Sequence, residues 1–165
     1  MITQSALLSA LAVIMLYIAS VWPTGQLGLA AVASFFVAAG VIESGVRAGI
    51  YVYVVSSALA GLLLPDKAAP FLFILFFGFY PVLKLLIERI GSVPVRWILK
   101  FAVFNASLSV IWFLLRELIF ASGDSFPGTI LIYIGGNAIF ALYDYGYSKA
   151  LLLYKDRVSG RVNRR

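Results

Sequence analysis

The residues able to do chemistry in this chain are polar side chains set at helical spacing inside long apolar segments. The clearest set has spacings of four, three and four residues, which is one face of a helix. Its members are Asn105, Ser109, Trp112 and Arg116. Two further sets also follow a helical spacing: Tyr133, Asn137, Asp144 and Ser148, and Tyr80, Lys84 and Glu88. Because polar groups are costly in apolar surroundings, we expect all three faces to line the interior of a helix bundle.

Two of these charges, Lys84 and Asp144, are predicted to form an ion pair. Each lies about 14–16 residues into its segment from the same side, or roughly 21–24 Å at 1.5 Å per residue. Asn105, counted from the other end of its own segment, reaches a similar depth. The sequence therefore predicts a buried polar cluster of Lys84, Asn105 and Asp144. Its ion pair either locks two helices together or takes part in function.

A second polar cluster is expected nearer the outer surface of the bundle. It combines hydrogen-bonding groups, aromatic faces and both signs of charge, a mixture that suits a small polar-aromatic ligand. Its members are Gln26, Trp112, Arg116, Glu117, Tyr133 and Asn137. The alternative for its charged members is that Arg116 extends to the membrane interface and Glu117 pairs with it or meets water.

The missing residue types exclude several kinds of chemistry. The chain has no Cys and no His, which removes disulfides, thiolate chemistry, imidazole bases and the commonest zinc sites. The carboxylates Glu88, Glu117 and Asp144 are too few and too scattered for a metal site. We therefore expect no catalytic residue, no metal and no cofactor, and the chain is not predicted to be an enzyme. It also lacks a phosphate-binding loop for ATP hydrolysis.

The segments that position these residues are long enough to cross a bilayer. Hydrophobic residues make up 62% of the 165-residue chain and charged residues only 12%, so lipid must be the solvent for most side chains. We predict an all-α integral membrane protein, a bundle of six transmembrane helices in one domain spanning residues 1–165. The expected helices run from about Thr3 to Ser20, Leu27 to Ile42, Val46 to Leu64, Pro70 to Ile90, Val95 to Ala121 and Gly128 to Tyr154.

The distribution of positive charge predicts the orientation. Lys and Arg are concentrated in every second gap between the helices and in the C-terminal tail, which accounts for most of the net charge of +6. Cytoplasmic loops of membrane proteins carry the excess of Lys and Arg. We therefore predict a multi-pass protein of the cell membrane with both termini in the cytoplasm. The first apolar run has no basic residue before it and is expected to be a retained span. Nucleic-acid binding is not expected, because the sequence indicates no folded basic surface.

Small residues and one proline predict how the helices meet. Ala6 and Ala10 lie four residues apart on the first helix and form a small-residue stripe that can pack internally or face another protein. Gly45, Ala48 and Gly49 open the third helix. Pro81, in the middle of the fourth, removes a backbone donor and is expected to kink that helix.

This plan resembles the substrate-binding S components of energy-coupling factor transporters. The likeness lies in six short-looped helices with both ends inside, the stripe on the first helix, and the Gly45-x-x-Ala48-Gly49 sequence after a small-residue second helix. It implies a vitamin-like micronutrient bound noncovalently near the outer surface, with the first gap as a lid. It further implies that Ala6 and Ala10 meet a transmembrane coupling subunit, which works with two ATPase subunits.

A scaffold of cell-envelope assembly is the alternative function. Such a protein is similar in size and helix number to the rod-shape-determining membrane protein MreD. It would hold partners on its helix faces and need no pocket. A closed cavity of mixed polarity near Arg116 and Asn137 favours the binding component, whereas a filled interior favours the scaffold.

Overall fold

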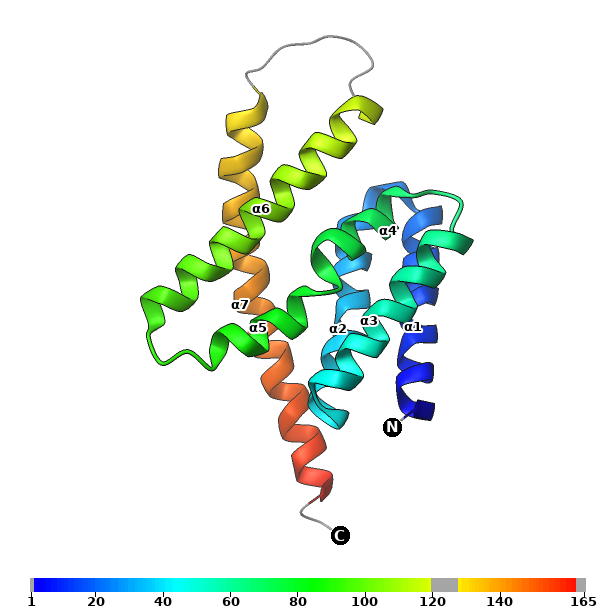
Figure 1. Ribbon diagram of the computed structural model, residues 1–165, viewed down its shortest axis with the longest axis vertical. Helices are drawn as coiled ribbons and strands as arrows, with labels where there is room; N and C mark the ends of the chain where they lie inside the picture. Colours follow the sequence, from blue (N-terminus) through cyan, green and yellow to red (C-terminus); the bar gives the residue numbers. More distant parts are fainter. Residues whose placement is uncertain (1, 120–127, 163–165) are drawn as a thin grey trace. The chain divides into compact units, whose positions relative to one another are not determined.

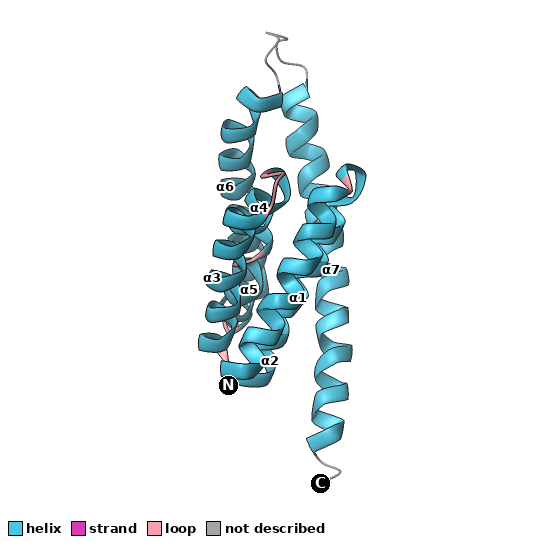
Figure 2. Ribbon diagram, turned by 90° about the vertical axis from the view of Figure 1, so that its right-hand side faces the viewer, coloured by secondary structure: helices cyan, strands magenta, loops and turns pink. Residues whose placement is uncertain are grey.

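The computed structural model of the chain is helical, and the residues that it describes contain no strand (Figure 2). It describes residues 2–119 and 128–162, with side chains except at 23, 115–119, 128–129 and 157–162. The helices are α1 (Ile2–Val21), η1 (Pro23–Gly25), α2 (Gln26–Ser44), α3 (Val46–Leu63), α4 (Ala68–Leu72), the π-helical η2 (Phe73–Phe77), α5 (Tyr80–Glu88), α6 (Val93–Ile119) and α7 (Gly128–Val162).

The prediction of an all-helical fold is confirmed, and five described segments are long and apolar enough to cross a membrane. They are Ile2–Val21, Gln26–Ser44, Val46–Leu63, Ala68–Glu88 and Val93–Leu114. The predicted sixth span corresponds to α7, which is not among the five. The mean hydropathy of α7 is lowered by polar residues, which include Asn137, Asp144 and several tyrosines. The helix also runs past Tyr154 to Val162, so part of the expected basic tail continues α7.

The chain divides into two compact units, Met1–Arg96 and Trp97–Arg165. In the first unit, α1, α2 and α3 pack against one another, and α2 also contacts η2 and α5 (Figure 1). Its core is a cluster of buried apolar side chains from α1, α2, α3 and η2, with Leu64 just beyond α3: Leu16, Ala30, Ala33, Val37, Val52, Ala60, Leu64 and Phe73. The second unit consists mainly of α6 and α7, which run antiparallel (Figure 1).

Two glycines allow the close pairing of α2 and α3. Gly45 joins the helices with a φ of 88°, a backbone conformation that L side chains rarely adopt. A Cβ on Gly49 would lie only 2.1 Å from a methyl carbon of Val41, so α2 occupies the space that any side chain there would need. Ala48 beside it is fully buried. The glycine-rich start of α3 therefore has a packing role within the first unit.

The predicted fourth helix is interrupted, whereas Pro81 alone predicts only a kink. The Gly78 amide donates to the carbonyl of Phe73 (2.7 Å), five residues back, and a turn separates this π-helical segment from α5. Pro81 then lies in the first turn of α5, where a missing backbone N–H is tolerated. The proline thus begins a new helical segment.

Tyr53 of α3 donates a hydrogen bond to the Ile74 carbonyl, which loses its α-helical partner at this interruption. In a continuous α-helix the Gly78 amide would donate to the Ile74 carbonyl. Here the Tyr53 hydroxyl donates to that carbonyl instead, at 2.9 Å. The Tyr53 ring also packs against Phe73 and Phe79, with centroids 6.2 and 6.5 Å apart. Such a replacement bond is needed in lipid, where water cannot satisfy the carbonyl.

Gly78→Ala should destabilise the first unit. A Cβ at this position would lie 2.6 Å from the Tyr53 ring and 2.8 Å from the Phe73 ring, and overpacking of this kind costs about 1–3 kcal/mol. The measurement is unfolding of the purified protein in mixed micelles on titration with SDS. Gly28→Ala is the matched control, because nothing lies within 4 Å of its added Cβ. Equal stability of the two variants would contradict the packing described for Gly78.

Candidate functional site

Three polar contacts cross the interface between α6 and α7, and they form the candidate site. We call them the polar ladder: Lys100 with Asp144, Asn105 with Asn137, and Ser109 with Tyr133. In each contact the residue number on α7 falls as that on α6 rises, as one antiparallel register requires. Apolar rings lie between the contacts, with Phe140 stacked on Phe104 at 4.5 Å. The predicted polar faces of these two segments therefore do meet.

The middle contact is a reciprocal pair of amides. Asn105 Nδ2 donates to Asn137 Oδ1 at 2.8 Å, and Asn137 Nδ2 donates to Asn105 Oδ1 at 3.0 Å. Each amide also donates to a carbonyl one turn back in its own helix, that of Phe101 or Tyr133, both at 2.8 Å. Both NH₂ groups therefore use their two donors within α6 and α7. A polar amide can be kept in lipid only when its donors are satisfied in this way.

The charged contact joins two buried residues. Lys100 Nζ lies 2.8 Å from Asp144 Oδ2, and only 6% of Lys100 and 2% of Asp144 remain exposed. The Lys100 ammonium also lies 5.5 Å from the centre of the Trp97 ring, within the range of a cation–π interaction. Each buried charge thus has an opposite charge beside it, as a low-dielectric environment demands.

Of the predicted buried cluster, these contacts include Asn105 and Asp144. Within the first unit, Lys84 is 2% exposed and its Nζ lies 2.7 Å from Oε1 of Glu88, on the same face of α5. Asp144 belongs to the second unit and pairs there with Lys100. The Lys84–Asp144 pair would join the two units, and it stays a prediction. Asn105 is paired with Asn137 within the second unit.

Sequence reasoning missed Lys100 as a partner of Asp144, although a signal was present. Lys100 lies off the helical face that carries Asn105 and close in sequence to Arg89 and Arg96, which belong to a basic gap between predicted helices. If Asn105 faces Asn137, however, an antiparallel register places residue 98 opposite Asp144. A lysine two residues away reaches that carboxylate with its long side chain.

The members of the predicted outer cluster have different environments. Tyr133 and Asn137 belong to the polar ladder, and Trp112 is half-buried on α6. The positions of Arg116 and Glu117 belong to α6, but their side chains lie outside the described residues.

Gln26, the remaining member, lies in the first unit. Its Nε2 donates to Asp66 Oδ2 at 2.6 Å, while Asp66 Oδ1 accepts from the Ala68 amide at 3.1 Å. The Asp66 amide also donates to the Ser20 hydroxyl at 3.1 Å. Asp66 therefore ties the end of α1 and the start of α2 to the connection between α3 and α4.

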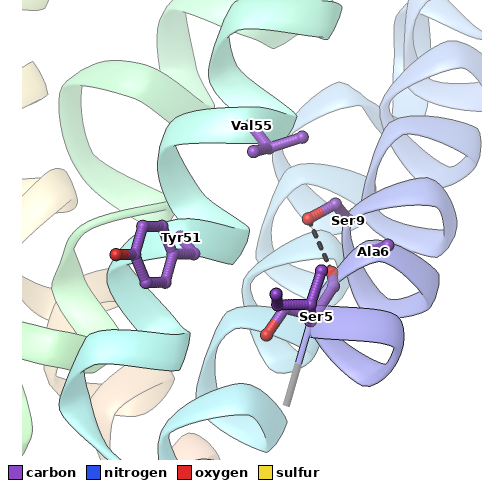
Figure 3. A pocket seen from close by; sticks show the side chains of 6 residues that line it. Ser5, Ala6, Ser9, Tyr51 and Val55 are labelled. Atoms are coloured by element: carbon purple, nitrogen blue, oxygen red, sulfur yellow. Dashed lines mark hydrogen bonds between the residues drawn. The ribbon is translucent and has the colours of Figure 1, made fainter.

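The small-residue stripe on α1 divides between two faces. Ser9 and Ala12 are buried, whereas Ala6 and Ala10 are exposed. Beside Ala6, a groove of ≈ 430 Å³ runs between α1 and α3. Its lining residues are Ile2, Ser5, Ala6, Ser9, Tyr51 and Val55 (Figure 3). The two alanines predicted to meet a partner thus lie on a face that α2 and α3 leave open.

The described residues contain no group of three or more His, Cys, Asp or Glu side chains that could hold a metal ion. Comparison with known proteins finds no match among protein-family models, curated proteins or solved structures. The contacts above are therefore the basis for a functional proposal.

The Asn105–Asn137 pair should show energetic coupling. Asn105→Leu or Asn137→Leu alone leaves a polar amide facing a hydrocarbon side chain, whereas the double leucine variant leaves none. We expect the double variant to be more stable than the sum of the single effects predicts, by about 1 kcal/mol. SDS-titrated unfolding measures all four proteins.

The matched control for the amide pair combines Asn105→Leu with Ser56→Ala. Ser56 donates to Val52 in the first unit and has no bond to Asn105. These two effects should simply add. Additive energies for Asn105 and Asn137 as well would contradict a reciprocal pair.

A second double-mutant cycle distinguishes the two lysines as partners of Asp144. Asp144→Leu removes the carboxylate that lies 2.8 Å from the buried Lys100 ammonium, and loss of one partner of a buried ion pair costs about 3–5 kcal/mol in other proteins. Adding Lys100→Leu should recover a large part of this loss. Lys84→Leu should recover less, because Glu88 lies 2.7 Å from that ammonium. Greater recovery with Lys84→Leu would identify the interhelical pair predicted from the sequence as the stronger one.

Proposed function

We propose that this protein is a membrane-embedded substrate-binding component of a micronutrient uptake transporter. It captures a vitamin-like small molecule at the extracellular side and works with an energising complex of a transmembrane coupling subunit and ATPase subunits. Binding is noncovalent, and the chain itself has no catalytic role. In this proposal all six helical segments cross the cell membrane and both termini lie in the cytoplasm.

Five apolar segments of membrane-spanning length support the bundle. The α7 helix supplies the sixth span, because its polar Asn137 and Asp144 are paired with groups on α6 and need no water. An even number of spans places both termini on one side, and the excess of Lys and Arg there makes that side the cytoplasm.

The exposed face of α1 supports the proposal that a partner protein binds there. Ala6 and Ala10 lie on this face, whereas Leu16 and Ala19 of the same helix are fully buried against the rest of the first unit. Helices associate in lipid through small residues that let their backbones approach closely. An exposed pair of alanines one turn apart therefore suits a helix of a second protein.

The proposed ligand would bind through groups that now bond to one another. Tyr133 shares a 2.7 Å hydrogen bond with Ser109, which is exposed. A small polar ligand can exchange this bond for its own without leaving an unsatisfied group. Trp112 would add an aromatic surface, and Arg116 and Glu117 would add charge.

The internal pairing of the polar ladder favours a second candidate, a scaffold of cell-envelope assembly. Asn105 and Asn137 use both donors of each amide within the hairpin, so these groups have no need of a ligand. In this reading α1 still binds a partner, but the partner is structural and no small molecule is captured.

Mass spectrometry of the gently purified protein tests the proposal. We expect a copurified small molecule together with a membrane subunit and ATPases. Replacing both alanines, Ala6→Leu and Ala10→Leu, should reduce recovery of the partner at least about tenfold, because two bulky side chains prevent close helix contact. The small molecule should remain bound.

Ala106→Leu is the matched control, since Ala106 is an exposed alanine on α6. It should leave recovery of both the ligand and the partner unchanged. Recovery of a structural partner without any small molecule would favour the scaffold instead. Recovery of neither would contradict the transport proposal.

A further inference from the structure

The groove between α1 and α3 has the chemistry of a hydrocarbon-binding site. Its walls come from Ala6 and Ile2 on α1 and from Val55 on α3. The hydroxyl of Ser9, which also lines it, donates to the Ser5 carbonyl of its own helix at 2.8 Å (Figure 3). That serine therefore presents no unsatisfied donor to an occupant, and the groove suits an apolar chain.

The position of the groove favours a single chain over a helix. It measures ≈ 430 Å³ and lies between two helices that are themselves in contact. A helix with its side chains is about 10–12 Å across and would lie over such a groove without filling it. A lipid acyl chain is narrower and can lie along it.

A positive charge lies close to one end of this groove. Arg47 is four residues before Tyr51 on α3, which places both on the same face, and both side chains are exposed. Among the described residues, no ion pair or hydrogen bond involves the Arg47 guanidinium. In the proposed topology this arginine lies at the cytoplasmic interface, where anionic headgroups attract basic side chains.

We propose that the groove binds a phospholipid of the inner leaflet with an anionic headgroup. One acyl chain lies between α1 and α3 against Ala6 and Val55, in the space that a partner helix on Ala6 and Ala10 would lie over without filling, and the phosphate meets Arg47. The lipid site rests on the proposed topology but not on the transport role, because a chain without ligand or coupling subunit would still hold the lipid.

Native mass spectrometry of the full chain tests this site. The protein in mild detergent is offered equal amounts of phosphatidylglycerol and phosphatidylcholine with identical acyl chains. We expect retention of phosphatidylglycerol to exceed that of phosphatidylcholine about fivefold. Arg47→Gln should bring the ratio close to one, whereas Arg89→Gln, at another exposed arginine, should leave it unchanged.

Filling the groove separates chain binding from headgroup binding. Val55→Trp should reduce retention of both lipids, because the indole occupies the space of the acyl chain. Val54→Trp is the matched control, since Val54 is also exposed on α3 but is not among the residues that line the groove. Both variants must keep the wild-type SDS-unfolding midpoint, which shows that they are folded.

Three results would overturn the lipid site. These are equal retention of the two lipids by the wild-type protein, no difference between Val55→Trp and Val54→Trp, and crosslinking of Val55→Cys in membranes to a second copy of the chain. The chain has no native cysteine, so that crosslink would have a single origin. The proposed topology is measured separately, by labelling Arg161→Cys from each side of the membrane.

Discussion

Hydrocarbon offers no hydrogen bonds, so a helix bundle that crosses a membrane, as proposed for this protein, must supply partners for its interior polar groups from within the protein. The contacts between α6 and α7 satisfy this condition with an ion pair, a reciprocal amide pair and a hydroxyl pair. Lys100 and Asp144 neutralise each other, and Asn105 and Asn137 exchange two hydrogen bonds. The same contacts fix how the two helices align, because a shift of one turn would separate every pair.

The first unit relies instead on close packing of small residues. Gly49 brings α3 against Val41 of α2, and alanines fill much of the shared core. Since apolar side chains gain little by leaving lipid for protein, this closeness supplies contact energy that the hydrophobic effect cannot. It also gives the Gly45-x-x-Ala48-Gly49 sequence a structural explanation independent of any family resemblance.

The interruption before α5 shows how a departure from regular structure is accommodated. Gly78 leaves room for the Tyr53 ring, the Tyr53 hydroxyl satisfies the Ile74 carbonyl, and Pro81 starts the next helical segment. Three residues that look unrelated in sequence thus act at one place. π-Helical segments of this kind are frequent at functional sites, and here Tyr53 of α3 both bonds to the segment and packs against it.

The sequence by itself determined the helical class, the approximate bounds of the helices and the faces that carry polar residues. Composition and helical periodicity are local properties, and both depend only on residues near one another in the chain. The sequence also identified Asn105, Asn137 and Asp144 as residues in need of partners, because an unpaired polar group in lipid is costly wherever it lies.

Only the tertiary structure decided which partners those residues have. The Asp144–Lys100 pair and the Gln26–Asp66 bond depend on helix register and on how connections fold back, which no local pattern encodes. The π-helical turn likewise required Tyr53 from another helix. Pairing is a property of two segments at once, so the sequence determined that the polar groups must pair, and the packing of the helices decided with what.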